Sequence, residues 1–339
     1  MAFFKPLLFI VLVVFAVCAS EVNSRTTHHH GLSMIKKHHE QWMAKHGRVY
    51  KNEMEREMRF KIFAENYKHI ESANNKAGNS SYKLGLNSYA DLTDEEFQSY
   101  AFGYLTPKVS PSSRNFRRFR YRNATDLPES VDWRQKGAVT HIKNQGRCGS
   151  CWAFAMVAMV EGMHQINKGE LVSLSEQHLL DCTEGCYGCG GGYYYETYMY
   201  IERNGGIAKE EDYSYEGYED YCQARYIKPY VKIGGFETVP RNEHALMQAV
   251  ANQPVGVSID GSGFRYYSEG IFDGPCCKYH SNHAVVIVGY GTSEDGIPYW
   301  LVKNSWGTRW GEDGYVRMKR GVNICGINND ASYPTPPRD

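Results

Sequence analysis

Four residues have side chains of the types that acyl transfer to a thiol requires: Cys151, His283, Asn304 and Gln145. Cys151 begins a strongly apolar stretch that predicts a helix, and a helix N-terminus stabilises anions. Its thiol is therefore expected to have a lowered pKa and to be partly thiolate near neutral pH. A thiolate nucleophile needs a base and a group that orients the base. His283 precedes one strand-like run and Asn304 follows another, so antiparallel pairing would bring them together. Gln145 could donate its amide to a developing oxyanion, alongside the Cys151 backbone N–H.

The elements that must position these residues are helical first and strand-rich afterwards. A helix is predicted over 152–167, and a capping box at Ser173-Leu-Ser-Glu176 predicts another through Leu180. The last hundred residues carry strand patterns separated by turns that contain Gly, Asp and Pro, at 255–259, 284–290, 299–303 and 314–319. A helical half followed by a strand half predicts an α+β fold, with the cleft between the halves as the default site.

The N-terminal third has a different pattern. Six residues at spacings of 4, 4, 3, 4 and 4 share one face of a predicted long helix: Glu55, Arg59, Phe63, Asn66, Ile70 and Asn74. Residues 85–97 predict a strand and turn that lead into a short helix capped at Thr93 or Asp94. Residues 107–123 combine Pro, Ser and six basic residues without an amphipathic period, which predicts a linker open to proteolysis.

Composition and the N-terminus indicate an exported protein. The 339 residues carry 38 Lys+Arg and 38 Asp+Glu, and zero net charge argues against binding nucleic acid by bulk charge. The apolar run 7–17, preceded by Lys5 and followed by small residues, predicts a secretory signal segment cleaved near Ala19 or Ser20. It is too short to span a bilayer, and no later segment is expected to do so. Glycosylation sequons begin at Asn79 and Asn123.

The cysteines favour disulfides over metal. Nine of the 10 Cys remain after the signal segment, so at least one thiol is expected outside the disulfide set. Zinc at Cys148-x-x-Cys151 and Cys186-x-x-Cys189 is the alternative, but an exported chain favours disulfides. We therefore expect no metal and no cofactor.

These motifs resemble the papain family of cysteine proteases along nearly the whole chain. The segment 144–154 holds the Cys-Gly-Ser-Cys-Trp pattern, with His283 132 residues and Asn304 153 residues beyond Cys151. The set from Glu55 to Asn74 resembles the ERFNIN motif of inhibitory propeptides in this family. Residues 85–91 resemble the companion GxNxFxD motif, with Tyr89 in place of Phe, and 127–133 resembles a mature N-terminus. The short sequence segments 251–254 and 267–270 resemble those of the plant branch of this family.

The resemblance implies a division of the chain and a set of roles. It implies a signal peptide at 1–20, an inhibitory propeptide at 21–126 and a peptidase domain at 127–339, with a helical and a barrel-like β half. Cys151 would be the nucleophile, His283 the general base and then acid, Asn304 its orienter and Gln145 the oxyanion donor. Trp306 would shield the hydrogen bond between His283 and Asn304.

The resemblance also implies disulfides and a substrate site. The implied pairs are Cys148–Cys189, Cys182–Cys222 and Cys276–Cys325, with Cys186 and Cys277 outside the pattern. Substrate would lie along Gly191 and Gly192, beside a second pocket (S2) formed by Tyr193, Tyr194, Tyr195, Ser258, Ser281, Ala284 and Asp330. A carboxylate at the pocket floor leads to the hypothesis that Arg or Lys is accepted at P2, as well as aromatic or aliphatic groups. The alternative is that Asp330 turns outward to water.

The resulting expectation is a secreted or vacuolar endopeptidase made as a zymogen. Its expected partners are protein or peptide substrates, its own propeptide as an intramolecular inhibitor and cystatin-type inhibitors. Neither nucleic acid nor membrane is expected to bind, and a monomer is expected in a vacuole, a lysosome-like compartment or the extracellular space. An exopeptidase is one alternative, although no His-bearing insert lies between Cys182 and Cys222. A catalytically weak storage or binding protein is the other.

Overall fold

The computed structural model describes residues 31–76, 78, 80–105, 119–274 and 281–338. The chain forms two compact units, one of Met1–Ala73 with Ala90–Leu92 and one of Asn74–Tyr89 with Thr93–Asp339. The predicted signal segment, most of the predicted linker and the sequon at Asn79 lie outside the described residues. Within the described ranges, no helix is long and apolar enough to cross a membrane.

The first unit is built from a helix at 31–46 and most of helix α2 (Glu53–Lys76), which confirms the predicted long helix. Phe63 and Ile70 supply its buried face. Two polar members of the predicted set, Arg59 and Asn66, bind a loop. Arg59 donates to the Asp91 carbonyl at 3.1 Å, and the Asn66 amide donates to the carbonyl of Ala90 at 2.8 Å. The mixed polarity of this helix face therefore reflects loop binding within the unit.

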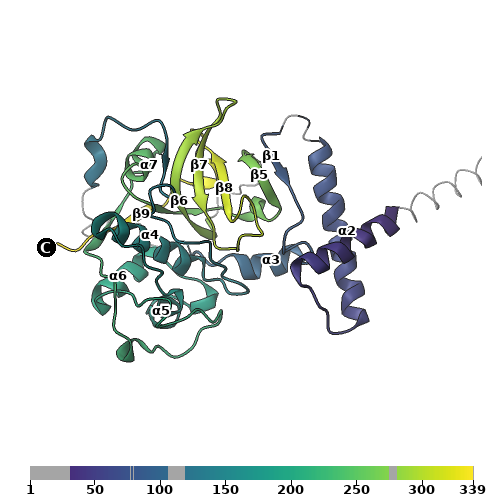
Figure 1. Ribbon diagram of the computed structural model, residues 1–339, viewed down its shortest axis with the longest axis horizontal. Coiled ribbons are helices and arrows are strands. Elements are labelled where there is room, and N and C mark those ends of the chain that lie inside the picture. The colour runs from purple at the N-terminus through teal and green to yellow at the C-terminus, as the bar shows by residue number, and fades with distance from the viewer. Residues whose placement is uncertain (1–30, 77, 79, 106–118, 275–280, 339) are drawn as a thin grey trace, which may run out of the picture. The chain divides into compact units, whose positions relative to one another are not determined.

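The second unit centres on a mixed sheet with strand order β1-β5-β8-β7-β6-β4-β9-β3, in which β2 pairs with β6 (Figure 1). The strands are β1 (Tyr82–Leu84), β2 (Val131–Asp132), β3 (Gly235–Thr238), β4 (Val255–Ile259), β5 (Tyr267–Phe272), β6 (His283–Thr292), β7 (Pro298–Lys303), β8 (Tyr315–Lys319) and β9 (Ala331–Thr335). The antiparallel pairing of β6 with β7, which places Val286 opposite Lys303, confirms the pairing expected from the sequence.

One strand differs from the sequence expectation. The strand of the N-terminal third is β1, which ends at Leu84, so residues 85–91 form a loop and turns rather than a strand and turn. Asn74 explains the position, because its side-chain amide exchanges two hydrogen bonds with the Leu84 backbone, at 2.9 and 3.0 Å. These two bonds hold Leu84 in place at the end of α2.

The helices of the second unit are α3 (Asp94–Ala101), α4 (Cys151–Lys168), α5 (Glu176–Cys182), α6 (Tyr194–Asn204) and α7 (Glu243–Val250). Short 3-10 helices are η2 (Arg120–Asn123), η3 (Gly188–Gly190), η4 (Ala224–Tyr226), η5 (Ser262–Phe264) and η6 (Ile324–Gly326). Figure 1 shows α4, α5 and α6 grouped together, and α4 packs against β6. The unit therefore joins a helical half to a sheet half, as the α+β prediction requires.

The cap of α5 corrects a prediction. Ser175, not Ser173, is the N-cap, and its Oγ accepts from the His178 N–H at 2.9 Å. The predicted capping box needed the Glu176 carboxylate to turn back on the helix end. That carboxylate instead accepts from the Lys143 ammonium at 2.8 Å. The ion pair with Lys143 therefore replaces the predicted capping-box hydrogen bond.

Two of the three implied disulfides are present, Cys148–Cys189 and Cys182–Cys222. The third pair includes Cys276, and Cys276 and Cys277 both lie outside the described residues. Cys186 is a free, half-buried thiol. Each disulfide is expected to contribute about 2–5 kcal/mol to the free energy of unfolding.

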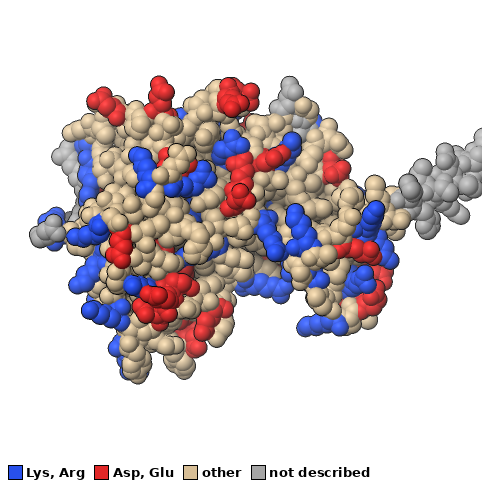
Figure 2. Space-filling view, in the orientation of Figure 1, with Lys and Arg blue, Asp and Glu red and all other residues tan. Residues whose placement is uncertain are grey.

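Charged side chains of both signs are interspersed over the face shown in Figure 2. A smaller set is buried between the helical and sheet halves. The Lys143 ammonium donates to Glu161 at 3.1 Å and to Glu176 at 2.8 Å, and each of the two carboxylate side chains is only 1% exposed. Because these groups line a small cavity with Lys303 and Asn304, the cluster joins α4 and α5 to the end of β7.

Replacing the buried cation should destabilise the chain strongly. Lys143→Met leaves two buried carboxylates without their cation, which is expected to cost about 3–5 kcal/mol of unfolding free energy. Lys168→Met, at the exposed end of α4, is the matched control and should change stability by less than about 0.5 kcal/mol. Guanidinium denaturation of the full chain measures both, and equal midpoints for the two variants would contradict the role of the cluster.

Candidate active site

Cys151 is the first residue of α4 and its side chain is fully buried. The Cys151 Sγ accepts from the backbone N–H of Ala284, the second residue of β6, at 3.5 Å. The sulfur therefore lies where the helical and sheet halves meet.

His283 and Asn304 meet because β6 and β7 are antiparallel neighbours. The His283 Nε2 lies 2.8 Å from the Asn304 Oδ1, so Asn304 accepts from the imidazole in the tautomer protonated at Nε2. The Trp306 ring stacks on the imidazole at a centroid distance of 4.7 Å. The other ring nitrogen, Nδ1, is buried and has no hydrogen-bond partner among the described residues. The ring is thus held on one side and has a free nitrogen on the other for proton transfer.

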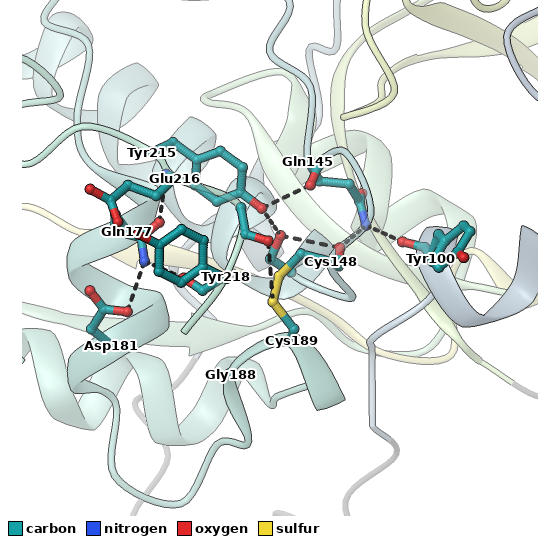
Figure 3. Close-up of a disulfide and its surroundings, with 12 residues drawn as sticks. Tyr100, Gln145, Cys148, Gln177, Asp181, Gly188, Cys189, Tyr215, Glu216 and Tyr218 are labelled. Carbon is teal, nitrogen blue, oxygen red and sulfur yellow. Dashed lines mark hydrogen bonds between the residues drawn. A yellow bond between two sulfur atoms is a disulfide. The ribbon is translucent and has the colours of Figure 1, made fainter. Parts of the chain in front are cut away.

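Gln145 presents its amide to carbonyl oxygens. The Nε2 group donates to the carbonyls of Cys148 at 2.9 Å, Tyr100 at 3.2 Å and Ala101 at 3.3 Å. Ser305 fixes the other end of the side chain by donating from Oγ to Oε1 at 2.6 Å. Figure 3 shows this amide beside the Cys148–Cys189 disulfide. A group held in this way can stabilise negative charge on an oxygen without rearranging.

Residues 93–105, called the cleft segment below, cover these groups. The segment opens with α3, whose N-cap Thr93 forms a capping box with Glu96, which confirms the predicted cap. Past α3, Gly103 and Tyr104 donate backbone N–H groups to the Asn282 carbonyl at 3.2 and 3.0 Å. Gly192 donates to the Gly103 carbonyl at 2.8 Å, and Gly192 accepts from the Leu105 N–H at 3.0 Å. The segment therefore occupies the Gly192 backbone where the resemblance places substrate.

At Gly103 the cleft segment passes against the backbone of Gly149, two residues before Cys151. A Cβ at this position would lie 1.7 Å from the carbonyl oxygen of Gly149, which is far inside van der Waals contact. Only glycine permits the backbone to pass at this distance.

Beneath the cleft segment, burial favours the uncharged forms of the Cys151 thiol and the His283 imidazole. Burial raises the pKa of the Cys151 thiol to about 11, despite hydrogen bonds from the Ala284, Gly103 and Trp152 N–H groups. Burial likewise lowers the pKa of His283 to about 4, against the opposing effect of Asn304. The expectation of a partial thiolate is therefore wrong for the covered chain. The helix terminus favours the anion, but loss of hydration beneath the cleft segment outweighs it.

The predicted S2 pocket holds Tyr104 of the cleft segment. Its ring packs on Tyr194 at a centroid distance of 5.0 Å, and its hydroxyl donates to the Asp330 carboxylate. Burial raises the pKa of that carboxylate, although the hydrogen bond from Tyr104 opposes the shift. The Ser258 Oγ is buried nearby in β4 and has no hydrogen-bond partner among the described residues.

The other residues assigned to the pocket have varied positions. Ala284 borders the Cys151 sulfur, and Gly191 is buried beside Gly192. Tyr193 and Ser281 are half-buried; Tyr193 is the N-cap of α6, and Ser281 lies two residues before β6. Tyr195 packs edge to face on Phe236 of β3, at a centroid distance of 5.9 Å.

Sequence reasoning missed three residues that the structure brings to this site: Phe102, Tyr104 and Arg265. Phe102 lies 5.8 Å from the His283 ring and packs on Phe97 at 5.4 Å. A glycine between two aromatic residues, Phe102-Gly-Tyr104, was the available signal for a close backbone approach. Among the described residues, no group of three or more His, Cys, Asp or Glu could hold a metal ion.

Two family models match the chain. The model described as papain family cysteine protease matches residues 127–335, and the one described as cathepsin propeptide inhibitor domain matches residues 39–97. The senescence-specific cysteine protease SAG12 of Arabidopsis thaliana is 46% identical over 314 residues, which are 89% of this chain and 90% of that protein. Vignain of Ricinus communis is 47% identical over 312 residues, or 87% and 84% of the two proteins.

Solved structures of two protease precursors are similar to most of this chain. The recombinant stem bromelain precursor has a TM-score of 0.81 and 44% identity, covering 89% of this chain and 99% of its own. The proform of Amb a 11, a cysteine protease and ragweed pollen allergen, has a TM-score of 0.83 and 39% identity, covering 90% and 95%.

The glycine contact can be tested through the reactivity of the thiol. In the full chain, alkylation of Cys151 should be slow at pH 7 and still accelerating at pH 10, because its pKa is about 11. Gly103→Ala should displace the cleft segment, hydrate the thiol and raise the rate at pH 7 at least about tenfold. Gly78→Ala, where a Cβ meets nothing within 4 Å, is the control. Mass spectrometry locates the label, and unchanged rates in Gly103→Ala would refute the covering role.

Proposed function

The chain belongs to the papain family of cysteine proteases, and we propose that Cys151, His283, Asn304 and Gln145 perform its peptide-bond hydrolysis. The observation that carries the proposal is the hydrogen bond between His283 Nε2 and Asn304 Oδ1, beside a cysteine at a helix N-terminus. This arrangement orients a base whose other nitrogen is unpartnered within the described part of the chain. A nucleophile, an oriented base and an oxyanion donor are the parts that thiol acyl transfer needs.

The first half of the reaction forms a thioester. With the cleft segment gone, water reaches the site and the helix N-terminus favours transfer of the Cys151 proton to His283 Nδ1. The sulfur attacks the peptide carbonyl carbon, and the oxygen takes the negative charge while accepting from the Cys151 N–H and the Gln145 amide. His283 then gives its proton to the leaving nitrogen, the carbon–nitrogen bond breaks, and an acyl-enzyme remains.

The second half returns the enzyme to its starting state. His283 removes a proton from a water molecule, whose oxygen attacks the thioester carbon. The carbon–sulfur bond breaks, the acid product leaves, and the thiolate and imidazolium re-form. Asn304 keeps the ring oriented through both halves, and Trp306 keeps water from the hydrogen bond that Asn304 makes.

The protease is made as a zymogen, because the chain carries a propeptide inhibitor domain upstream of the peptidase domain. The propeptide is its intramolecular inhibitor. We propose boundaries of 1–20 for a signal peptide, 21–126 for the propeptide and 127–339 for the mature domain. In support, the peptidase family model begins at Leu127.

The destination and remaining partners are also proposals. The apolar run 7–17 supports entry into the secretory pathway, with a vacuole, a lysosome-like compartment or the extracellular space as the destination. The exposed Asn123 is a candidate glycosylation site. We propose protein or peptide substrates, cystatin-type inhibitors and a monomeric enzyme.

Covalent labelling tests the catalytic assignment. Titration of the acid-activated protein with a thiol-directed epoxide should abolish peptide hydrolysis at one equivalent, with the label on Cys151. Cys151→Ser should be inactive and unlabelled. A folded, propeptide-free protein that neither hydrolyses peptides nor takes the label would instead support a storage or binding protein.

The pocket floor can be tested with paired substrates. If Asp330 faces bound substrate, peptides with Arg at P2 should be cleaved at rates comparable to Leu, and Asp330→Ala should lower the Arg/Leu ratio of kcat/KM about tenfold. The isosteric Asp330→Asn separates charge from shape and should also lower the ratio. An unchanged ratio in both variants would eliminate the charged-floor hypothesis.

A further inference from the structure

Arg265 is a buried cation that contacts the N-terminal end of the cleft segment, whereas Tyr104 lies near the C-terminal end of that segment. Arg265 lies between η5 and β5, and its side chain is only 5% exposed. The guanidinium pairs with the Asp94 carboxylate, and its Nη2 donates to the Tyr89 carbonyl at 3.1 Å. Asp94, Tyr89 and Arg265 belong to the same compact unit. Both oxygens come from residues upstream of the proposed mature N-terminus.

Aromatic rings connect this cation to the catalytic residues. Phe97 lies 5.4 Å from the guanidinium and 5.4 Å from the Trp306 ring, and Trp306 stacks on His283. The guanidinium also lies 4.6 Å from the centroid of the Tyr266 ring. Phe97 lies in the proposed propeptide and leaves with it. Arg265, Tyr266 and Trp306 belong to the proposed mature domain and remain.

The order of contacts along the cleft segment places Arg265 relative to the reaction. Asp94 contacts Arg265, Phe102 lies over His283, and Tyr104 reaches Asp330. Along the cleft segment, the contact with Arg265 thus comes before the contact with His283, and the contact with Asp330 comes after it. If Asp330 belongs to the pocket on the acyl side of the scissile bond, Arg265 lies on the side of the leaving group.

Release of the propeptide removes two oxygen acceptors from the guanidinium. The guanidinium then keeps the contact with the Tyr266 ring, 4.6 Å away, and its freed N–H groups can form charge-assisted hydrogen bonds with a new anion. The planar guanidinium of Arg265 can donate two parallel hydrogen bonds to a carboxylate while it packs on the Tyr266 ring.

We propose that in the mature protease Arg265 binds an acidic side chain of the substrate, on the leaving-group side of the scissile bond. The inference rests on the proposed function, which supplies the direction of the bound peptide. Helix α3 spans about 12 Å between the Arg265 contact and the catalytic residues. An extended peptide covers this length in about three to four residues, and a Glu side chain adds its own reach. The preferred acidic residue is therefore the second, third or fourth after the scissile bond.

Isosteric substrate pairs test the proposal in the activated wild-type enzyme. The two peptides of a pair are identical except at one position, the second, third or fourth after the scissile bond. One peptide has Glu there and the other has Gln. At one or more of these positions, kcat/KM should be about three- to tenfold higher for Glu at low ionic strength. The preference should shrink as salt is added. A Glu/Gln ratio of one at all three positions would overturn the proposal.

A variant assigns the preference to Arg265. Arg265→Gln should bring the Glu/Gln ratio to about one, whereas Arg203→Gln, on the exposed surface of α6, should leave the ratio of the wild type. A ratio that persists in Arg265→Gln overturns the assignment. If Arg265→Gln fails to fold or mature, the wild-type enzyme still decides the question. Its Glu/Gln ratio of kcat/KM and the salt dependence of that ratio show whether a cation binds the substrate on the leaving-group side of the scissile bond.

The outcome is distinguishable from failure of the proposed function. Cleavage of both peptides at equal rates by an enzyme labelled at Cys151 rejects the inference alone. Absence of cleavage and of label rejects the proposed function as well.

Discussion

The close passage of Gly103 over the Gly149 carbonyl is the constraint on which the state of this molecule depends. It allows Gly192 to pair with the cleft segment through two main-chain hydrogen bonds, and that pairing excludes water from Cys151. Excluding water opposes both charged forms, since it raises the pKa of the thiol and lowers that of the imidazole. The same chain segment thus covers Cys151 and His283 in a site whose burial favours their uncharged forms.

The catalytic geometry beneath the segment is supported from behind by a different kind of interaction. The strand that delivers Asn304 ends at Lys303, whose ammonium donates to the Thr140 carbonyl at 3.0 Å. Thr140 in turn donates to Glu161 at 2.6 Å, and Glu161 accepts from Lys143. Buried ion pairs of this kind gain little net stability but tolerate few alternative arrangements. The position of Asn304, and through it the orientation of His283, is therefore tied to the junction of the two halves.

The cleft segment also shows which parts of the cleft are charged. Its Tyr104 hydroxyl meets the Asp330 carboxylate at one end, and its Asp94 carboxylate meets Arg265 at the other. Asp330 and Arg265 therefore each have a partner of suitable chemistry in the segment that covers them.

The sequence by itself determined the catalytic residues as candidates, most element positions and the family. Thiol chemistry demands recognisable residue types, and helices such as α4 and strands such as β4, β6 and β7 follow from local periodicity. Tertiary structure alone decided the features that depend on distant neighbours. Ser175 replaced Ser173 as the cap of α5 because Lys143 takes the Glu176 carboxylate. Cys151 is a neutral thiol in the covered chain because burial, which no local pattern encodes, outweighs the helix terminus. The direction of Asp330 and the pairing of Arg265 likewise depend on residues more than 150 positions away, whose contacts exist only once the chain has folded.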